Sequence, residues 1–467
     1  MTLIKSISGI RGTIGGTAGE GLTPPDVVKY VSAYGTWLKQ QHKGKVCVII
    51  GRDARLSGEL VNNLTLATLS ALGIDCIDVG LSTTPTVEVA VTELKAQGGI
   101  IITASHNPKQ WNALKLLTDK GEFINENDGA KVLAIAENAA FNYADVNQLG
   151  KISLNNEMLK LHIEKILKLP YVDRKAIRAK KFKVVVDAVN SSGGIAVPML
   201  LEALGIENII KIHCEPNGQF AHNPEPLPEN LRDLAKAVTK NKAHLGISVD
   251  PDVDRLALVC EDGEMFGEEY TLVAVADYVL QYHKKGNTVS NLSSTRALRD
   301  VTEKAGGKYA ASAVGEVNVV RLMKETNAVV GGEGNGGIIL PELHYGRDAL
   351  VGIALFLSHL AKFGKSTSLL RSTYPNYYFS KNKIELTPEI DVDNILEKIK
   401  NKYKKQPVNT VDGVRIEFDK EWVHLRKSNT EPIIRIYAES KSMATAENLA
   451  KKIILDIKEL IKEGQAV

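Results

Sequence analysis

A serine that directly follows an apolar segment is the first residue whose position could support chemistry. Three isoleucines at positions 100–102 predict a buried strand, and the polar segment 103–108, which ends in a proline, predicts a loop after it. Open α/β sheets bind ligands beyond the carboxyl ends of their strands, so Ser105 in this loop is a candidate nucleophile. The alternative is that Ser105 and Asn107 only satisfy backbone groups of a turn.

A second candidate site follows the apolar segment 245–249, where the chain reads Asp-Pro-Asp-Val-Asp-Arg from Asp250 to Arg255. Alternate residues of an extended segment point the same way, so the three aspartates are expected to converge. Two carboxylates about 4 Å apart repel by roughly 4 kcal/mol at an effective dielectric constant near 20, and one arginine does not cancel three such charges. A hard dication is the expected partner, and Mg²⁺ suits a site that also holds a phosphate oxygen.

Two other interpretations of this aspartate loop are open. A calcium-binding loop has a glutamate at its twelfth position, here Glu261, but it needs a glycine where Arg255 stands, and its flanks are helices rather than strands. In an aspartyl-phosphate phosphatase, the first aspartate after a buried strand is the nucleophile, and this would be Asp250.

Two later segments have the composition of sugar and phosphate binding loops. In the glycine-rich segment 331–337, Glu333 and Asn335 could share hydrogen bonds with neighbouring sugar hydroxyls, and a flexible surface turn is the alternative. Segment 426–432 reads RKSNTEP and is followed by Arg435. It offers arginines, hydroxyls and backbone N–H groups to a phosphate dianion, although a hairpin with a solvated rim has a similar composition.

Alternating strands and helices are expected to position these loops. A helix is predicted from Thr23, with Pro24 in its first turn and a core-facing stripe at Val27, Val31, Tyr34 and Leu38. The alternation indicates α/β layers with a largely parallel sheet.

A repeated junction divides the chain. Gly73, Gly205 and Gly306 each stand where a predicted helix ends and a strand begins, which favours three copies of one α/β unit. After residue 373, a lysine-rich helix, three strands and a last amphipathic helix predict a smaller α+β domain. We therefore expect domains at 1–150, 151–255, 256–370 and 371–467.

The composition bounds the class of protein. Of the 467 residues, 44% are hydrophobic and 24% charged, and the net charge is +3, which is ordinary for a soluble protein and suggests neither nucleic acid nor a membrane as a partner. The four cysteines lie far apart in apolar contexts, so we expect reduced thiols. Without a signal-like or membrane-spanning segment, the expected location is the cytoplasm.

Five motifs together resemble those of the α-D-phosphohexomutases, which include phosphoglucomutase, phosphomannomutase and phosphoglucosamine mutase. Ser105-His106-Asn107-Pro108 and the following segment to Lys115 resemble the phosphoserine loop of this family, and the aspartate loop resembles its metal loop. Segments 331–337 and 426–432 resemble its sugar-recognition and phosphate-binding loops, and the N-terminal Gly-Ile-Arg-Gly adds a fifth match. Ala113, Pro251 and Gly337 depart from the residues that are usual at these places.

The resemblance covers the full chain and implies a role for each matching residue. It implies three similar α/β domains with mixed sheets and a smaller C-terminal domain, arranged as a heart around a central cleft. The implied catalytic residues are Ser105, His106, Lys115, Arg11 and Arg255; the implied metal ligands are Ser105, Asp250, Asp252 and Asp254; the implied substrate-binding residues are Glu333, Asn335, Arg426, Ser428, Asn429, Thr430 and Arg435. For Arg11, an ordinary ion pair is the alternative, and Glu316 is a candidate for proton transfer.

The resemblance also implies a reaction. An enzyme phosphorylated on Ser105 and holding Mg²⁺ would interconvert hexose 6-phosphate and hexose 1-phosphate through a 1,6-bisphosphate, which also serves as activator. The Thr-Glu-Pro ending of segment 426–432 favours glucosamine phosphate, with glucose or mannose phosphate as the alternative. The expected partner is a phosphosugar, and the chain is expected to be a monomer or a homodimer.

Overall fold

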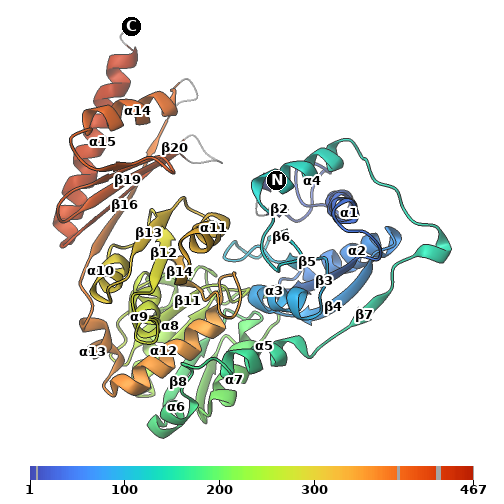
Figure 1. The fold of residues 1–467 in the computed structure, drawn as a ribbon, viewed down its shortest axis with the longest axis horizontal. Helices are drawn as coiled ribbons and strands as arrows, with labels where there is room; N and C mark the ends of the chain where they lie inside the picture. The colour runs from blue at the N-terminus through green and yellow to red at the C-terminus, as the bar shows by residue number, and fades with distance from the viewer. Residues whose placement is uncertain (7–8, 387–389, 428–432, 466–467) are drawn as a thin grey trace.

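The computed structural model describes residues 1–6, 9–386, 390–427 and 433–465. They form four β-sheets with helices packed on them, which we call domains I to IV in chain order (Figure 1). Domains II and III lie side by side, with domain I on one side and domain IV on the other (Figure 1). Three similar α/β domains and a C-terminal domain with an antiparallel sheet confirm the predicted fold class.

Domain I contains a seven-stranded sheet in the order β1-β2-β6-β5-β3-β4-β7. Only the pairs β3–β4, β3–β5 and β4–β7 are parallel, so the sheet is mixed rather than largely parallel. The reason is that β6 pairs antiparallel with β5 on one side and with β2 of the N-terminal hairpin on the other. Its elements are β1 (Leu3–Ser6), β2 (Gly9–Thr13), α1 (Pro24–Gln41), β3 (Cys47–Arg52), α2 (Gly58–Ala71), β4 (Asp75–Leu81), α3 (Thr84–Glu93), β5 (Gly98–Ile102), β6 (Trp111–Leu117), α4 (Glu126–Glu137), the 3₁₀ turn η1 (Val146–Gln148) and β7 (Ile152–Leu154).

The predicted start of the first helix is confirmed. Thr23 is the N-cap of α1, and its backbone N–H donates to the Asp26 carboxylate at 3.1 Å. The four residues of the predicted core-facing stripe, Val27, Val31, Tyr34 and Leu38, are all buried.

Domain II contains a four-stranded sheet in the order β11-β10-β8-β9. Because β11 pairs antiparallel with β10, the expected boundary after residue 255 would cut through this sheet. The elements are α5 (Met158–Leu167), α6 (Arg174–Lys180), β8 (Lys183–Asp187), α7 (Gly193–Leu204), β9 (Asn208–Ile212), the 3₁₀ turn η2 (Pro228–Asn230), α8 (Arg232–Lys240), β10 (Leu245–Val249) and β11 (Leu256–Cys260).

Domain III repeats the α/β layout with a sheet in the order β13-β12-β14-β15. Gly73, Gly205 and Gly306 all have positive φ, which confirms the repeated helix-to-strand junction. The elements are α9 (Tyr270–Leu280), β12 (Asn287–Asn291), α10 (Ala297–Lys304), β13 (Tyr309–Ser312), α11 (Glu316–Thr326), β14 (Ala328–Glu333), β15 (Gly337–Ile339), α12 (Ala349–Phe363) and α13 (Thr367–Ser372).

Domain IV has a five-stranded antiparallel sheet in the order β16-β20-β19-β18-β17. Its elements are β16 (Tyr378–Glu385), α14 (Val392–Lys402), β17 (Val408–Asn409), β18 (Val414–Glu417), β19 (Trp422–Lys427), β20 (Ile433–Ser440) and α15 (Met443–Gln465).

The hydrophobic cores show which domains are tied together. Domains II and III share one continuous core around the almost fully buried helix α12, and domain IV has a core of its own. Domain I has two cores, the smaller of which includes Met158 of α5. Polar contacts join domain IV to domain III, including Ser293 Oγ with His424 Nδ1 at 3.0 Å and the Glu439 carboxylate with the Arg296 N–H at 3.0 Å. Domains II and III therefore form the rigid centre of the molecule.

All four cysteines are free thiols, two of them buried (Cys76, Cys260) and two half-buried (Cys47, Cys214). Among the described residues, every helix is too short or too polar to cross a lipid bilayer.

Candidate active site

Ser105 lies where domain I meets domain II. It follows β5 in a segment that we call the serine loop (residues 103–110), and it has a left-handed backbone with φ 48°. Its hydroxyl donates to Asp250 Oδ2 at 2.7 Å, and His106 Nδ1 lies 3.5 Å from the same hydroxyl oxygen. The candidate nucleophile and the first residue of the aspartate loop are therefore in direct contact.

Arg55 fixes the serine loop, and the sequence analysis did not identify it. Its guanidinium is buried and donates to four carbonyl oxygens, namely those of Ser105, Asn107 (2.7 Å), Pro108 (2.8 Å) and Trp111 (3.0 Å). Asp53 holds Arg55 Nε at 3.0 Å and accepts the Thr103 hydroxyl at 2.7 Å. The available signal was the Gly-Arg-Asp-Ala-Arg segment at the carboxyl end of β3, because β3 is the parallel neighbour of β5.

The three aspartates converge, but the predicted reason was wrong. Residues 250–255 form a tight turn between β10 and β11 rather than an extended segment, and Val253 has φ 62°. Asp250 Oδ1 accepts the backbone N–H groups of Asp254 and Arg255, each at 3.1 Å, so the loop wraps around this carboxylate. One oxygen from each of Asp250, Asp252 and Asp254 lies within 4.8 Å of the other two.

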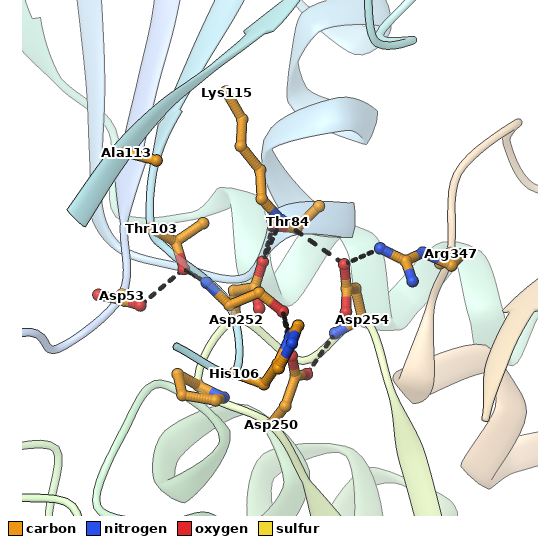
Figure 2. A network of polar contacts seen from close by, with 12 residues as sticks. Asp53, Thr84, Thr103, His106, Ala113, Lys115, Asp250, Asp252, Asp254 and Arg347 are labelled. Carbon is orange, nitrogen blue, oxygen red and sulfur yellow. Dashed lines mark hydrogen bonds and ion pairs between the residues drawn. The ribbon is translucent and has the colours of Figure 1, made fainter. Parts of the chain in front are cut away.

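Cations from domains I and III partly balance this charge. Lys115 Nζ lies 2.6 Å from Asp252 Oδ2 and 3.6 Å from Asp254 Oδ2, and Arg347 Nη2 lies 2.7 Å from Asp254 Oδ2 (Figure 2). Burial by itself lowers the pKa of Lys115, but Asp252 and Asp254 outweigh it and raise that pKa. Burial, and then the charges of Asp252 and Asp254, raise the pKa of Asp250 well above its usual value.

The donor set of the aspartate loop fits a hard cation. Oδ1 of Asp252 and Oδ1 of Asp254 are buried and accept no hydrogen bond from any residue that the structure describes. Unpaired carboxylate oxygens in this number are costly unless a cation shares them. The calcium-loop alternative is contradicted, because the flanks are strands and Glu261 binds the Ser368 N–H at 3.0 Å instead of facing the loop.

Arg347 connects the aspartate loop to the predicted sugar loop, and the sequence analysis did not identify this residue either. Besides Asp254, it donates to Glu316 Oε2 at 2.8 Å and to Glu333 Oε2 at 3.0 Å. Glu333 Oε1 accepts from Asn291 at 2.9 Å. Arg347 stands in the loop before α12, and its only sequence signal was a charged Arg-Asp pair after a glycine.

A cleft of about 1200 Å³ is lined by seven of the predicted catalytic and substrate-binding residues, whereas Asp250, Asp252 and Asp254 are not among its lining residues. It is lined by residues of domains I, II and III, among them Arg11, Ser105, His106, Lys115, Arg255, Glu316, Glu333, Asn335 and Arg347. Burial, and then Arg255, lower the pKa of His106 to about 3, so this ring is neutral near pH 7. Arg11 Nη1 donates to Asn107 Oδ1 at 2.9 Å, and Arg255 Nη1 lies 3.4 Å from Glu225 Oε1.

The two predicted phosphate-binding residues of domain IV that the structure describes, Arg426 and Arg435, are not part of this cleft. Arg426 Nε lies 2.9 Å from Asp412 Oδ2, and neither Arg426 nor Arg435 lines the cleft. Arg426, Arg435 and Lys383 stand directly opposite one another on β19, β20 and β16, so they form a cationic row across the sheet. Ser428, Asn429 and Thr430 lie outside the described residues.

Comparisons with known proteins agree with this architecture. Four family models match in order: Phosphoglucomutase/phosphomannomutase, alpha/beta/alpha domain I at residues 3–143, domain II at 160–263, domain III at 267–377, and the C-terminal domain at 384–455. A solved phosphoglucomutase/phosphomannomutase family protein from Burkholderia thailandensis superposes with a TM-score of 0.83 at 25% identity, covering 98% of each chain.

Two curated relatives cover nearly the whole chain. A phosphoglucomutase/phosphomannomutase from Thermococcus kodakarensis is 36% identical over 97% of this chain and 99% of its own. A phosphoglucosamine/phosphogalactosamine mutase from Sulfurisphaera tokodaii is 31% identical over 97% of this chain and 98% of its own. The fold and the site define a phosphosugar isomerase. The chain belongs to the α-D-phosphohexomutase family, of which the matched phosphoglucomutase/phosphomannomutase domains are the parts.

Proposed function

We propose that this phosphohexomutase works through a phosphoserine at Ser105. The contact that supports this proposal most directly is the 2.7 Å hydrogen bond between the Ser105 hydroxyl and Asp250, which places the acceptor atom for a phosphoryl group beside the candidate metal ligands. Arg55 holds the backbone carbonyl of Ser105, so the nucleophile is preorganised by groups that take no part in the chemistry.

Asp250, Asp252 and Asp254 are the residues that would hold Mg²⁺, together with an oxygen on Ser105. When bound, Mg²⁺ supplies positive charge next to the phosphoryl oxygens and polarises them. Lys115 and Arg255, which line the same cleft, stabilise the remaining charge of the transferred group, and Arg11 holds the Asn107 side chain of the serine loop. His106 is neutral beside Ser105, so it can donate one hydrogen bond without adding charge.

The transfer proceeds in two balanced steps. The O–P bond of phosphoserine breaks while a new P–O bond forms at the free hydroxyl of the hexose phosphate, which gives a 1,6-bisphosphate and the Ser105 hydroxyl. The hydroxyl proton of the sugar leaves to a nearby base, and we assign this role to Glu316, which lines the cleft and whose pKa burial raises. The departing Ser105 oxygen takes up one proton, so the net proton movement in this step is from the sugar hydroxyl to Ser105. The bisphosphate then turns over and returns its other phosphate to Ser105, and the net proton movement is reversed, from the Ser105 hydroxyl to the released sugar oxygen.

Glu333 and Asn335 are proposed to bind sugar hydroxyls at the same cleft wall. Arg426, Arg435 and the loop with Ser428, Asn429 and Thr430 are proposed to grip the phosphate that does not react. Since the described residues of domain IV do not line the cleft, this grip requires domain IV to close over the bound sugar. Closure also excludes water from the phosphoserine, which suppresses hydrolysis.

Glucosamine 6-phosphate is the substrate we propose, with glucose and mannose phosphates as the alternative. The carboxylate of Glu333 lines the cleft, and a carboxylate can bind an ammonium group on the sugar. The mutases named above act, by their names, on amino sugars in one case and on glucose and mannose in the other. We expect a cytoplasmic enzyme that needs a hexose 1,6-bisphosphate as activator.

Phosphorus NMR of the purified protein tests this function. The protein is incubated with Mg²⁺, a trace of glucose 1,6-bisphosphate and, in separate tubes, the 6-phosphates of glucosamine, glucose and mannose. The proposal predicts fastest conversion of glucosamine 6-phosphate to its 1-phosphate, and no conversion by Ser105→Ala. Faster turnover of glucose 6-phosphate or mannose 6-phosphate would contradict glucosamine 6-phosphate as the preferred substrate. The phosphatase alternative predicts instead that inorganic phosphate is released, and that Asp250→Asn abolishes this release whereas Ser105→Ala does not. That result would contradict the mutase mechanism.

A further inference from the structure

Domain II carries a second group of metal-ligand side chains, separate from the aspartate loop. Asp187 ends β8, His213 directly follows β9, and His222 lies in the loop after it. His213 Nδ1 lies 3.0 Å from Asp187 Oδ2, and His222 Nε2 lies 3.1 Å from the same oxygen. Two imidazoles and one carboxylate are a donor set that binds first-row transition metals, including Zn²⁺.

The hydrogen bonding of His222 points to a cation at this position. Its Nδ1 lies 2.8 Å from the carbonyl oxygen of Asn223, and a carbonyl only accepts, so Nδ1 carries the proton. In the neutral ring, Nε2 then has a lone pair that faces both Asp187 oxygens, at 3.1 and 3.2 Å. His222 Nε2 and the Asp187 carboxylate are then both hydrogen-bond acceptors. At this distance, either a second ring proton or a metal ion must lie between them. A carbonyl behind the ligating ring is also the usual support of a metal-bound histidine.

The spacing and exposure of the group suit an exchangeable ion. Tetrahedral ligands about 2.0–2.1 Å from Zn²⁺ lie roughly 3.3 Å from one another, so separations of 3.0 and 3.1 Å need only a small widening. The Asp187 carboxylate is fully buried, whereas the side chains of His213 and His222 are 25% and 16% exposed, which leaves a path for the ion and room for a water ligand. We propose that Asp187, His213 and His222 bind one Zn²⁺ ion.

The site would brace a loop that supports the active site. Between the two histidines, Gln219 Oε1 lies 3.4 Å from Lys109 Nζ of the serine loop, and the Phe220 ring lies 5.0 Å from the Arg55 guanidinium. A metal bound at both ends of this loop ties it to β8. The ion is therefore structural and takes no part in phosphoryl transfer.

A second histidine group in the described part of the chain provides the matched control. His162, His344 and Asp348 also bring ligand atoms within 4.8 Å of one another. There, however, Asp348 accepts from His162 at 2.9 Å and from His344 at 3.3 Å, and His344 Nδ1 faces Glu88 at 3.2 Å. A doubly protonated His344 between Asp348 and Glu88 accounts for these contacts without a metal ion, and the group is nearly closed to solvent.

Calorimetric titration of the full-length, metal-stripped protein with Zn²⁺ tests the site. Millimolar Mg²⁺ is present throughout to occupy the aspartate loop. We expect one Zn²⁺ per chain, a loss of affinity of at least about 100-fold in His213→Gln and in His222→Gln, and unchanged binding in His344→Gln. Cobalt substitution of the wild type should give visible absorption bands that both site variants lack.

Several results would overturn the proposal. These are binding that His222→Gln leaves unchanged, binding that only His344→Gln removes, binding that Mg²⁺ displaces, and a cobalt complex without bands from bound nitrogen ligands. Glutamine keeps an N–H donor toward Asp187, and circular dichroism of each variant establishes that it is folded. If one histidine variant does not fold, the other histidine variant and the wild-type cobalt spectrum test whether the two histidines bind the metal.

Discussion

Ser105 of domain I and Asp250 of domain II share a hydrogen bond of 2.7 Å although 145 positions separate them in the chain. The contact spans two domains whose main cores are separate, so the chemistry depends on how those domains are held together. Lys115 and Thr84 of domain I add two further contacts to Asp252, each at 2.6 Å. The active site is thus also the joint between domains I and II.

Replacing Arg55 should impair catalysis without removing any reacting group. Arg55→Lys loses the planar fork that holds four carbonyl oxygens of the serine loop, so Ser105 moves relative to Asp250. A displacement near 1 Å costs on the order of 100-fold in rate, and we expect kcat to fall by about that factor. Steady-state kinetics of Arg52→Lys, whose guanidinium makes one long contact of 3.3 Å, should match the wild type. An unchanged kcat in Arg55→Lys would contradict this role.

Removing Mg²⁺ should lower the thermal stability of the protein as well as its activity. The aspartate loop holds buried carboxylate oxygens without hydrogen bonds among the described residues, and a cation that binds only the folded state stabilises it. At a Mg²⁺ concentration of 100 times Kd, the expected gain is about 2.7 kcal/mol, read as an increase in the unfolding midpoint over EDTA. Asp252→Asn should lose the increase, whereas the exposed Asp262→Asn should keep it. Equal increases in both variants would place the ion elsewhere.

His344 should make stability decrease at alkaline pH. Burial lowers its pKa, but hydrogen bonds with Asp348 and Glu88 outweigh burial and raise the pKa to about 10. An unfolded histidine has a pKa near 6.5. Between these values the folded state keeps a proton that the unfolded state has lost, so the free energy of unfolding falls by up to about 1.4 kcal/mol per pH unit.

The measurement is the thermal midpoint of unfolding from pH 6.5 to 10. His344→Gln should flatten this dependence, whereas His283→Gln, whose nearest carboxylate oxygen lies 3.9 Å away, should retain it. If the thermal midpoint falls equally with pH in the wild type and in His344→Gln, groups other than His344 cause the loss of stability.

Domain IV should move when the phosphosugar binds. Its core is separate, and Arg426 pairs with Asp412 instead of lining the cleft. Small-angle scattering should show a smaller radius of gyration on adding glucosamine 6-phosphate. Arg426→Gln should weaken this compaction because the phosphate loses one arginine contact, whereas Lys400→Gln on the exposed face of α14 should behave as the wild type. No change in the wild-type radius would argue against closure.

The sequence predicted the parts of the site that depend on local pattern. An apolar run followed by small polar residues identified the loop with Ser105, and three glycines at helix ends indicated the repeated unit, because burial periodicity and positive φ are properties of near neighbours. The convergence of the aspartates was expected from an extended strand, whereas a turn wrapped around Asp250 produces it. The residues that converge were thus predicted from the local pattern, whereas the backbone conformation that brings them together was not.

By itself, therefore, the sequence determined the strand-to-loop junctions, the repeated α/β units and the residue types that can bind a phosphosugar and transfer its phosphoryl group. Only the tertiary structure decided that Arg55 holds the serine loop and that Arg347 joins Asp254, Glu316 and Glu333. The same is true of the group formed by Asp187, His213 and His222. The physical reason is that these contacts join residues far apart in the chain, whose meeting depends on how whole sheets pack and not on the pattern around any one of them.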